Sequence, residues 1–217
     1  MGTEGNGVFS LNPVSGKSSH FRYEEDDPNS LSSNNVNSIV EDDFGQLWIG
    51  TREELWDGAL MGVGGLSRFN RLKKNFVRYV SETKNEEGYI ENNVTKLIKD
   101  SKGYIWFGMV SGDLYRLDPK DKIFEYFPEG SDSKTFVTSM IEDKSGTLWV
   151  GRQYEALKKT NLFSRNYKSW EKDQQSGLSD NHVVAIFQDS SQDLWVGTMA
   201  GGLNKYDFKT DEFTCYK

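Results

Sequence analysis

Short apolar, β-branched runs recur along the chain, and each is followed by a polar turn and a second apolar run. The first runs read V-N-S-I-V-E-D, V-T-K-L-I-K-D, V-T-S-M-I-E-D and V-V-A-I-F-Q-D, at residues 36–42, 94–100, 137–143 and 183–189. Partial alternation over six or seven residues predicts β-strands, and helical periodicity is absent throughout. The pattern therefore predicts an all-β chain.

A tryptophan at a fixed place marks the second strand of each unit. It lies in the motifs L-W-I-G, I-W-F-G, L-W-V-G and L-W-V-G, at Trp48, Trp106, Trp149 and Trp195, with intervals of 58, 43 and 46 residues. Ten extra residues follow the first motif, and removing them shortens the first interval to 48. A period of this size is typical of a β-propeller blade with four strands.

The remaining parts of each unit fit such a blade. An Asp-rich turn, usually with a glycine, joins the first two strands and predicts a tight hairpin. In the fourth copy Gln192 replaces the glycine, which predicts a turn that is either strained or differently closed. Third strands beginning near G-G-L or its equivalent and aromatic outer strands complete each unit. We predict a β-propeller of four-stranded antiparallel blades.

The first residues align with the second half of a unit, beginning at the G-T that elsewhere follows a tryptophan. We therefore predict one partial propeller domain over 1–217, a partial ring of about four and a half blades. It consists of a half blade at 2–23 and complete blades at 36–80, 94–127, 137–170 and 183–217. Because the last blade has its own outer strand, the half blade has no completing strands. Exposed blade edges predict self-association by strand pairing.

Composition narrows the classes of function. The net charge of -7 and the pI near 5.0 argue against a nucleic-acid partner, whose phosphates are bound mainly by Lys and Arg. The sequence shows no apolar run long enough for a membrane span and no signal peptide. The single cysteine, Cys215, allows no internal disulfide. We expect a soluble module.

The repeat resembles a known family. The motif V-x-x-I-x-E-D-x-x-G-x-L-W-x-G-T, followed by G-G-L-x-x-x-D, is similar to the two-component regulator propeller repeat, and the connector D-D-P-N-S-L-S-S-N-N-V at 26–36 strengthens the likeness. The resemblance implies the sensor region of a hybrid two-component system from gut Bacteroidetes. Such a receptor carries two seven-bladed propellers outside the inner membrane, then an immunoglobulin-like module, a membrane helix, a kinase and a receiver. It implies a non-enzymatic, periplasmic module.

Several residues could carry chemistry, although each has a structural explanation. The repeated tryptophans could stack on sugars, but a fixed place in every blade favours packing, and the same holds for Trp170. The Asp turns lack the graded ligands of a calcium loop, and His20 and His182 lack neighbours at the spacing of a zinc site. We predict no metal and no cofactor.

Motifs for catalysis are weak. There is no Gly-x-Ser-x-Gly elbow and no glycine loop for phosphate, and Glu53 and Glu54 are adjacent in a loop without defined geometry. One enzymatic alternative is a propeller lyase resembling virginiamycin B lyase, which requires a histidine base and a metal on one rim. His182 is the histidine near such a rim. We predict that the chain is not an enzyme.

The insertion at 51–63 is the strongest candidate for a binding site. It connects the second and third strands of a blade, on the face where propeller ligands commonly enter. The aromatic plane of Trp56 beside polar groups suits an oligosaccharide or a peptide; alternatively, Trp56 and Leu60 fold back over the blade edge. The predicted ligand-binding residues are Arg52, Glu54, Trp56, Arg152, Tyr154 and His182. The competing function is assembly through the exposed blade edges.

Overall fold

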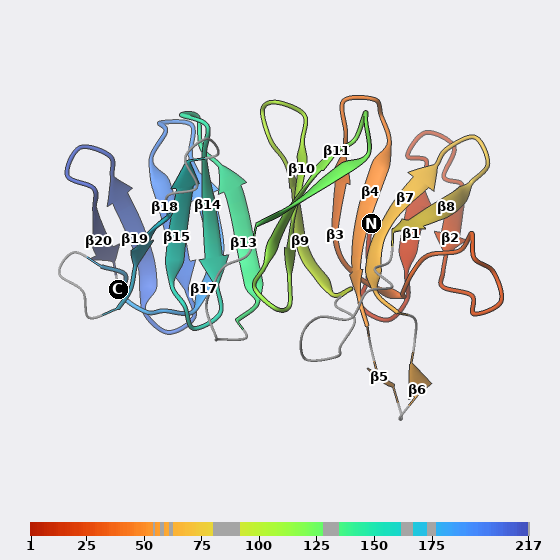
Figure 1. The fold of residues 1–217 in the computed structure, drawn as a ribbon, viewed down its shortest axis with the longest axis horizontal. Helices are drawn as coiled ribbons and strands as arrows, with labels where there is room; N and C mark the ends of the chain where they lie inside the picture. The colour runs from red at the N-terminus through yellow and green to blue at the C-terminus, as the bar shows by residue number, and fades with distance from the viewer. Residues whose placement is uncertain are drawn as a thin grey trace. The chain divides into compact units, whose positions relative to one another are not determined.

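In a computed structural model of the chain, every helix or strand assigned among the described residues is a β-strand (Figure 1). The structure describes residues 1–53, 55–56, 59–60, 63–79, 92–127, 135–161, 167–172 and 177–216. Contacts group the chain into two compact units, an N-terminal unit of 1–99 with 103–128 and a C-terminal unit of 100–102 with 129–217. The prediction of a single domain with the limits given above stays a prediction.

The N-terminal unit contains a half blade and two complete blades. The half blade is the hairpin of β1 (Val8–Leu11) and β2 (Ser18–Phe21). Blade 1 consists of β3 (Asn35–Glu41), β4 (Leu47–Arg52), β7 (Gly65–Asn70) and β8 (Asn75–Tyr79). Blade 2 consists of β9 (Val94–Lys99), β10 (Ile105–Met109), β11 (Leu114–Asp118) and β12 (Ile123–Phe127). A small hairpin, β5 (Leu55–Trp56) with β6 (Ala59–Leu60), lies between β4 and β7 in sequence.

The C-terminal unit contains two complete blades. Blade 3 consists of β13 (Val137–Glu142), β14 (Thr147–Arg152), β15 (Leu157–Asn161) and β16 (Tyr167–Trp170). Blade 4 consists of β17 (Val183–Gln188), β18 (Leu194–Thr198), β19 (Gly202–Asp207) and β20 (Glu212–Tyr216). In each blade neighbouring strands pair antiparallel in sequence order, apart from the intervening β5–β6 hairpin in blade 1. The predicted architecture of four-stranded antiparallel propeller blades is confirmed.

The repeated tryptophans are held by the hairpin turn of their own blade. The indole N–H of Trp149 donates to Asp143 at 2.7 Å, and the same bond joins Trp48 to Asp42 at 2.8 Å. The other oxygen of Asp143 accepts backbone N–H groups of the turn. One aspartate therefore caps the turn and orients the tryptophan. Because the rings of Trp48 and Trp149 are almost fully buried, packing is their structural role.

The glycines of the W-x-G motifs in blades 1 and 3 make room for the next inner strand. A Cβ on Gly50 would lie 2.6 Å from Cγ1 of Val94, and a Cβ on Gly151 would lie 2.4 Å from Cγ1 of Val183. Real Cβ atoms do not approach so closely, so a side chain there forces the blades apart. The glycine is thus required by packing between the tryptophan strand and the following inner strand.

Serine side chains also join successive inner strands. The hydroxyl of Ser38 accepts the backbone N–H of Leu97 at 3.1 Å, and that of Ser139 accepts the N–H of Ile186 at 3.1 Å. These bonds satisfy backbone donors that would otherwise lose a partner on burial. In blade 4 the equivalent residue is Ala185, which has no hydroxyl.

The hairpin turn of blade 4 closes in the same way as its counterparts. The N–H of Gln192 donates to the carbonyl of Asp189 at 3.0 Å, as Gly146 does to Asp143 at 2.9 Å. Gln192 has φ of 71°, which is the left-handed region that costs little only for glycine. Of the two possibilities predicted for this turn, the structure therefore shows the strained one.

Candidate ligand-binding rim

The rim of each unit is formed where two kinds of connection meet. The connection between the second and third strands of a blade lies at the same end as the connector that enters the next inner strand (Figure 1). In the N-terminal unit the N–H of Glu53 donates to the side chain of Asn93 at 2.5 Å, across 40 residues of sequence. In the C-terminal unit Tyr154 and His182 meet in the equivalent way. The residue directly before the inner-strand valine thus contacts the loop of the preceding blade.

Tyr154 and His182 are two predicted site residues that the fold brings into contact. Their rings meet edge to face, with centroids 5.2 Å apart and an angle of 62° between the planes. Tyr154 is 66% exposed, whereas His182 is half-buried. Edge-to-face contact is a favourable arrangement for aromatic rings and leaves a face of the tyrosine open to solvent. The pair therefore offers an aromatic surface with polar atoms beside it.

The loop that carries Tyr154 is pinned at several points. The N–H of Gln153 donates to the carbonyl of Phe136 at 3.0 Å, and the N–H of Ala156 donates to the carbonyl of Asn181 at 2.9 Å. Tyr154 and Ala156 both have positive φ, 79° and 64°. Non-glycine residues in this region are uncommon and are maintained only where surrounding structure enforces them. The loop is therefore preorganised, which reduces the entropy lost on binding.

Arg152 holds this loop from its buried side. Its side chain is 0% exposed, and Nη1 lies 3.4 Å from Oε2 of Glu155. The same carboxylate oxygen accepts the hydroxyl of Thr135 at 2.9 Å. A fully buried guanidinium is not available on the surface, so we assign Arg152 to holding the loop. Its predicted contact with a ligand is not supported by this placement.

His182 connects two adjacent rim loops. Its ring contacts Tyr154 in blade 3, and its carbonyl accepts the N–H of Met199, in the second-to-third strand connection of blade 4, at 2.9 Å. Met199 is 69% exposed. We call Tyr154, His182 and Met199 the rim strip. It combines an exposed aromatic ring, an imidazole and an adaptable apolar side chain, which is typical of a ligand-binding surface.

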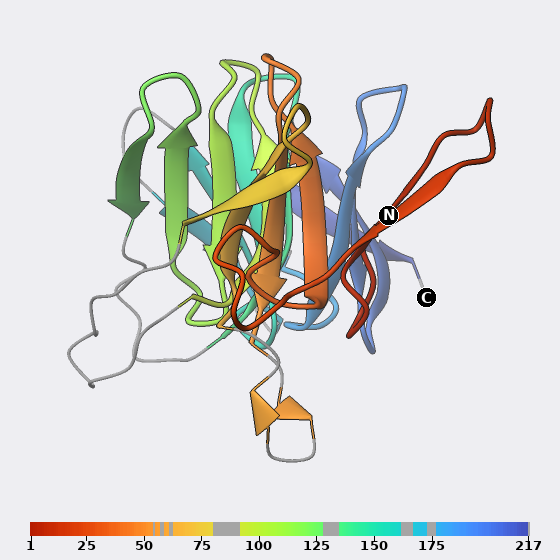
Figure 2. The same cartoon turned by 90° about the vertical axis from the view of Figure 1, so that its right-hand side faces the viewer.

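In the N-terminal unit the candidate residues form a separate group. Arg52 makes an exposed ion pair with Glu4, with Nη2 2.9 Å from Oε1. The β5–β6 hairpin extends away from the blade that carries it in both views (Figures 1 and 2). Glu54 lies outside the described residues, and so does the side chain of Trp56. The roles predicted for these two residues stay predictions.

Two rim residues were not predicted from the sequence. Asn93 and Met199 belong to the rim by their contacts, but neither type of residue suggested chemistry by itself. Aligning the repeats provides the missing signal, because Asn93 and His182 both directly precede the inner-strand valine. In the same alignment Arg152 occupies the position of Thr51 and Thr198 in the other blades, and both threonines are buried. Its burial was thus predictable from the repeat.

The second histidine has a local partner. The ring of His20 stacks on Phe9 at 3.9 Å between centroids, and Nε2 lies 2.6 Å from the carbonyl of Asn6. Across the part of the chain that the structure describes, no cluster of three or more His, Cys, Asp or Glu side chains could hold a metal ion. The described residues likewise include no helix with the length and apolar character of a membrane span.

Comparison with known proteins identifies the repeat. The model of the two component regulator propeller matches four segments, at residues 30–53, 88–111, 131–151 and 177–200. Each segment covers a connector, an inner strand and a tryptophan strand. The chain therefore carries four matches to the two-component regulator propeller repeat. This confirms the resemblance found in the repeat motifs.

Relatives of this propeller chain are much longer than it. Histidine kinase P4 of Formosa agariphila is 28% identical over an alignment of 221 positions, which covers 98% of this chain and 15% of the kinase. The extracellular domain of a putative hybrid two component system from B. thetaiotaomicron superposes with a TM-score of 0.74 at 18% identity. That match covers 98% of this chain and 25% of the other. The chain therefore spans a small part of these proteins.

The propeller fold is shared with an enzyme. Virginiamycin B lyase from Staphylococcus aureus superposes with a TM-score of 0.61 at 17% identity, covering 86% of this chain and 58% of the lyase. An identity this low shows a common fold and nothing about activity.

Proposed function

We propose that this propeller is a non-enzymatic ligand-binding module of a two-component signalling receptor, and that its rim recognises an oligosaccharide or a similar ligand. The observation that carries the proposal is the contact of Tyr154 with His182 on an exposed, pinned loop. An aromatic face suits the apolar face of a sugar ring, and the adjacent imidazole can bond to a hydroxyl group. The match to the two-component regulator propeller repeat and the extracellular domain of similar fold support a sensory role outside the inner membrane.

Such a module acts by shifting an equilibrium. A ligand can favour one receptor state only by the difference in its affinity for the two states. The rim strip offers a way to generate this difference, because His182 touches loops of two blades and a ligand spanning them stabilises one relative position. The insertion with Trp56 is a second candidate contact in the N-terminal unit.

Calorimetric titration tests the proposal. Maltohexaose, cellohexaose and hexagalacturonate are titrated into the wild-type chain and into Tyr154→Ala, Trp56→Ala and Phe44→Ala variants. Phe44 is the matched control, because it is 62% exposed but lies in the β3–β4 turn. We expect loss of Tyr154 to weaken binding about tenfold or more, equivalent to about 1.4 kcal/mol, with Phe44→Ala unchanged. Equal affinities in all variants would exclude the rim.

The alternative of a propeller lyase rests on fold similarity alone. It is tested by incubating the chain with quinupristin, with and without a chelator, and following ring opening by mass spectrometry. Turnover that disappears in the His182→Ala variant would establish the lyase function. If the chain is a non-enzymatic module, as we propose, quinupristin remains intact.

A further inference from the structure

Two turns of the N-terminal unit hold an apolar residue at their tip. In the β7–β8 turn the side-chain oxygen of Asn70 accepts the N–H of Leu72 at 3.1 Å. Asn12 caps the β1–β2 turn in the same way, and its side-chain oxygen accepts the N–H of Val14 at 2.9 Å. Leu72 and Val14 are each 96% exposed. The caps therefore hold both apolar side chains in solvent.

The same position of the turn carries a lysine in two other blades. The side chain of Asp118 accepts the N–H of Lys120 at 2.9 Å in blade 2, and that of Asp207 accepts the N–H of Lys209 at 2.7 Å in blade 4. Polar residues and glycine are usual in turns of this kind. The valine and the leucine are therefore not required by the turn, and the fold does not explain them.

A third apolar tip belongs to the same blade as Leu72. Phe44, in the β3–β4 turn, is 62% exposed. Arg71 joins the two turns of blade 1, because its Nε donates to the carbonyl of Gly45 at 2.7 Å and its Nη2 lies 2.8 Å from Oε1 of Glu41. All three turns lie at the end of the unit opposite the β5–β6 hairpin (Figures 1 and 2). Single exposed apolar residues are common, but three at one end form a surface.

The charges at this end leave an excess of lysine. Carboxylates at the end of β3 and in the β3–β4 turn are engaged within the unit, Glu41 by Arg71, Asp43 by Lys99 and Asp42 by the indole N–H of Trp48. Among the described residues no ion pair involves the exposed lysines beside the tips, which are Lys17, Lys73 and Lys74. The tips therefore present positive charge, although the net charge of the chain is -7.

We propose that these tips dock on an anionic lipid bilayer. The tip surface is defined by three apolar and three basic residues, Val14, Phe44, Leu72, Lys17, Lys73 and Lys74. Apolar side chains on protruding turns reach the boundary between headgroups and acyl chains, while the lysine ammonium groups stay beside the anionic headgroups. A deformable bilayer accepts separate tips, whereas a protein partner requires a continuous complementary surface. This inference is independent of ligand binding at the rim strip.

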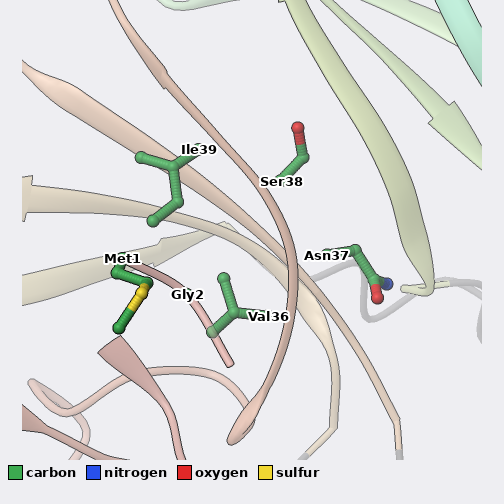
Figure 3. Close-up of a pocket in the computed structure, with 6 residues that line it drawn as sticks. All are labelled: Met1, Gly2, Val36, Asn37, Ser38 and Ile39. Carbon is green, nitrogen blue, oxygen red and sulfur yellow. The ribbon is translucent and has the colours of Figure 1, made fainter. Parts of the chain in front are cut away.

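The tip surface is separate from the open pocket of this unit. That pocket has a volume of ≈ 370 Å³ and is lined by Met1, Gly2 and residues 36–39 (Figure 3). Residues 36–39 form the start and middle of β3, which then runs to Glu41 and the β3–β4 turn. The pocket therefore lies away from the tips and does not contribute to the docking surface.

Co-sedimentation with vesicles tests the proposal. The full 217-residue chain is mixed with vesicles of phosphatidylcholine alone and with vesicles of equimolar phosphatidylcholine and phosphatidylglycerol. We expect binding to the anionic vesicles, weakened about fivefold by Lys73→Gln, and little binding to the neutral ones. Absent binding to the anionic vesicles, or equal binding to both, would overturn the proposal.

A Leu72→Lys variant separates insertion of the apolar tip from attraction between charges. It reproduces the lysine of the blade 2 turn, so the turn can accommodate it, and it adds a positive charge to the tip surface. We expect binding to the anionic vesicles to weaken about threefold, because the lost burial of leucine exceeds the gain from one cation. Unchanged or tighter binding would contradict insertion and overturn the proposal.

Val63→Lys is the matched control for this change. Val63 is 45% exposed, but it directly precedes the start of β7, at the opposite end of the same blade. We expect this variant to bind the anionic vesicles as the wild type does, with folding of each variant checked by circular dichroism. A loss equal to that of Leu72→Lys would show that the tips are not the docking surface.

Dextran sulfate distinguishes a bilayer from a soluble polyanion, because it supplies negative charge without acyl chains. If Leu72→Lys strengthens binding to dextran sulfate and to the anionic vesicles alike, the surface recognises polyanions and the proposal fails. Weaker vesicle binding of Leu72→Lys, with dextran sulfate binding retained, supports the bilayer.

Discussion

The indole N–H of Trp149 donates a hydrogen bond of 2.7 Å to Asp143, six residues earlier in the chain. The bond links the turn of blade 3 to its packing core, because the same carboxylate also caps the hairpin. Replacing Asp143 with Ala leaves a buried donor and uncaps the turn. We expect this change to lower the free energy of unfolding by about 2 to 3 kcal/mol, measured by denaturant unfolding. Asp26→Ala, on an exposed connector, is the control and should have little effect.

The W-x-G glycines offer a matched pair of variants. A Cβ on Gly151 would clash with Val183, whereas a Cβ on Gly197 meets its nearest atom at 3.8 Å. We therefore expect Gly151→Ala to destabilise the fold by about 1 to 3 kcal/mol through overpacking and Gly197→Ala to be far milder. Thermal unfolding compares the two. Equal losses would show that backbone freedom, not contact between blades, requires the glycine.

The turn of blade 4 predicts a stabilising change. Gln192→Gly relieves the left-handed backbone and should raise the free energy of unfolding by about 0.5 to 1 kcal/mol, since the added freedom of the unfolded glycine offsets part of the gain. The reciprocal change Gly146→Gln should lower it, because Gly146 has φ of 81°. Chemical denaturation of both variants checks the opposite signs.

Asp211 links stability to acid. Burial raises the pKa of Asp211, but hydrogen bonds and charges from Lys159 and Lys168 outweigh this effect and hold the pKa below its usual value. A lowered carboxyl pKa contributes stability above the unfolded value, near 3.9, and loses it as the pH falls through the folded value. Asp211→Asn should therefore lower the melting temperature at pH 7, and the difference from wild type should shrink below about pH 4. A difference constant with pH would contradict the charge-based account.

Most of the fold could be predicted from the regular spacing of the repeated motifs. A tryptophan, a turn and an inner strand recur at fixed spacing, so strands such as β13 and β14 follow from local pattern alone. The contact of Tyr154 with His182 could not be predicted in this way, because it depends on how one blade packs against the next. Arg152 shows the opposite case. Its charge suggested a surface role, although its place in the repeat is a buried strand position.

The central claim is that the rim strip binds a ligand through Tyr154. The most direct measurement is the affinity of the oligosaccharide that binds the wild-type chain, compared between Tyr154→Ala and Tyr154→Phe by calorimetry. We expect Tyr154→Ala to weaken binding at least tenfold, about 1.4 kcal/mol, whereas Tyr154→Phe retains most of the affinity because the aromatic face remains. Unchanged affinity in Tyr154→Ala, with the variant still folded, would contradict the claim.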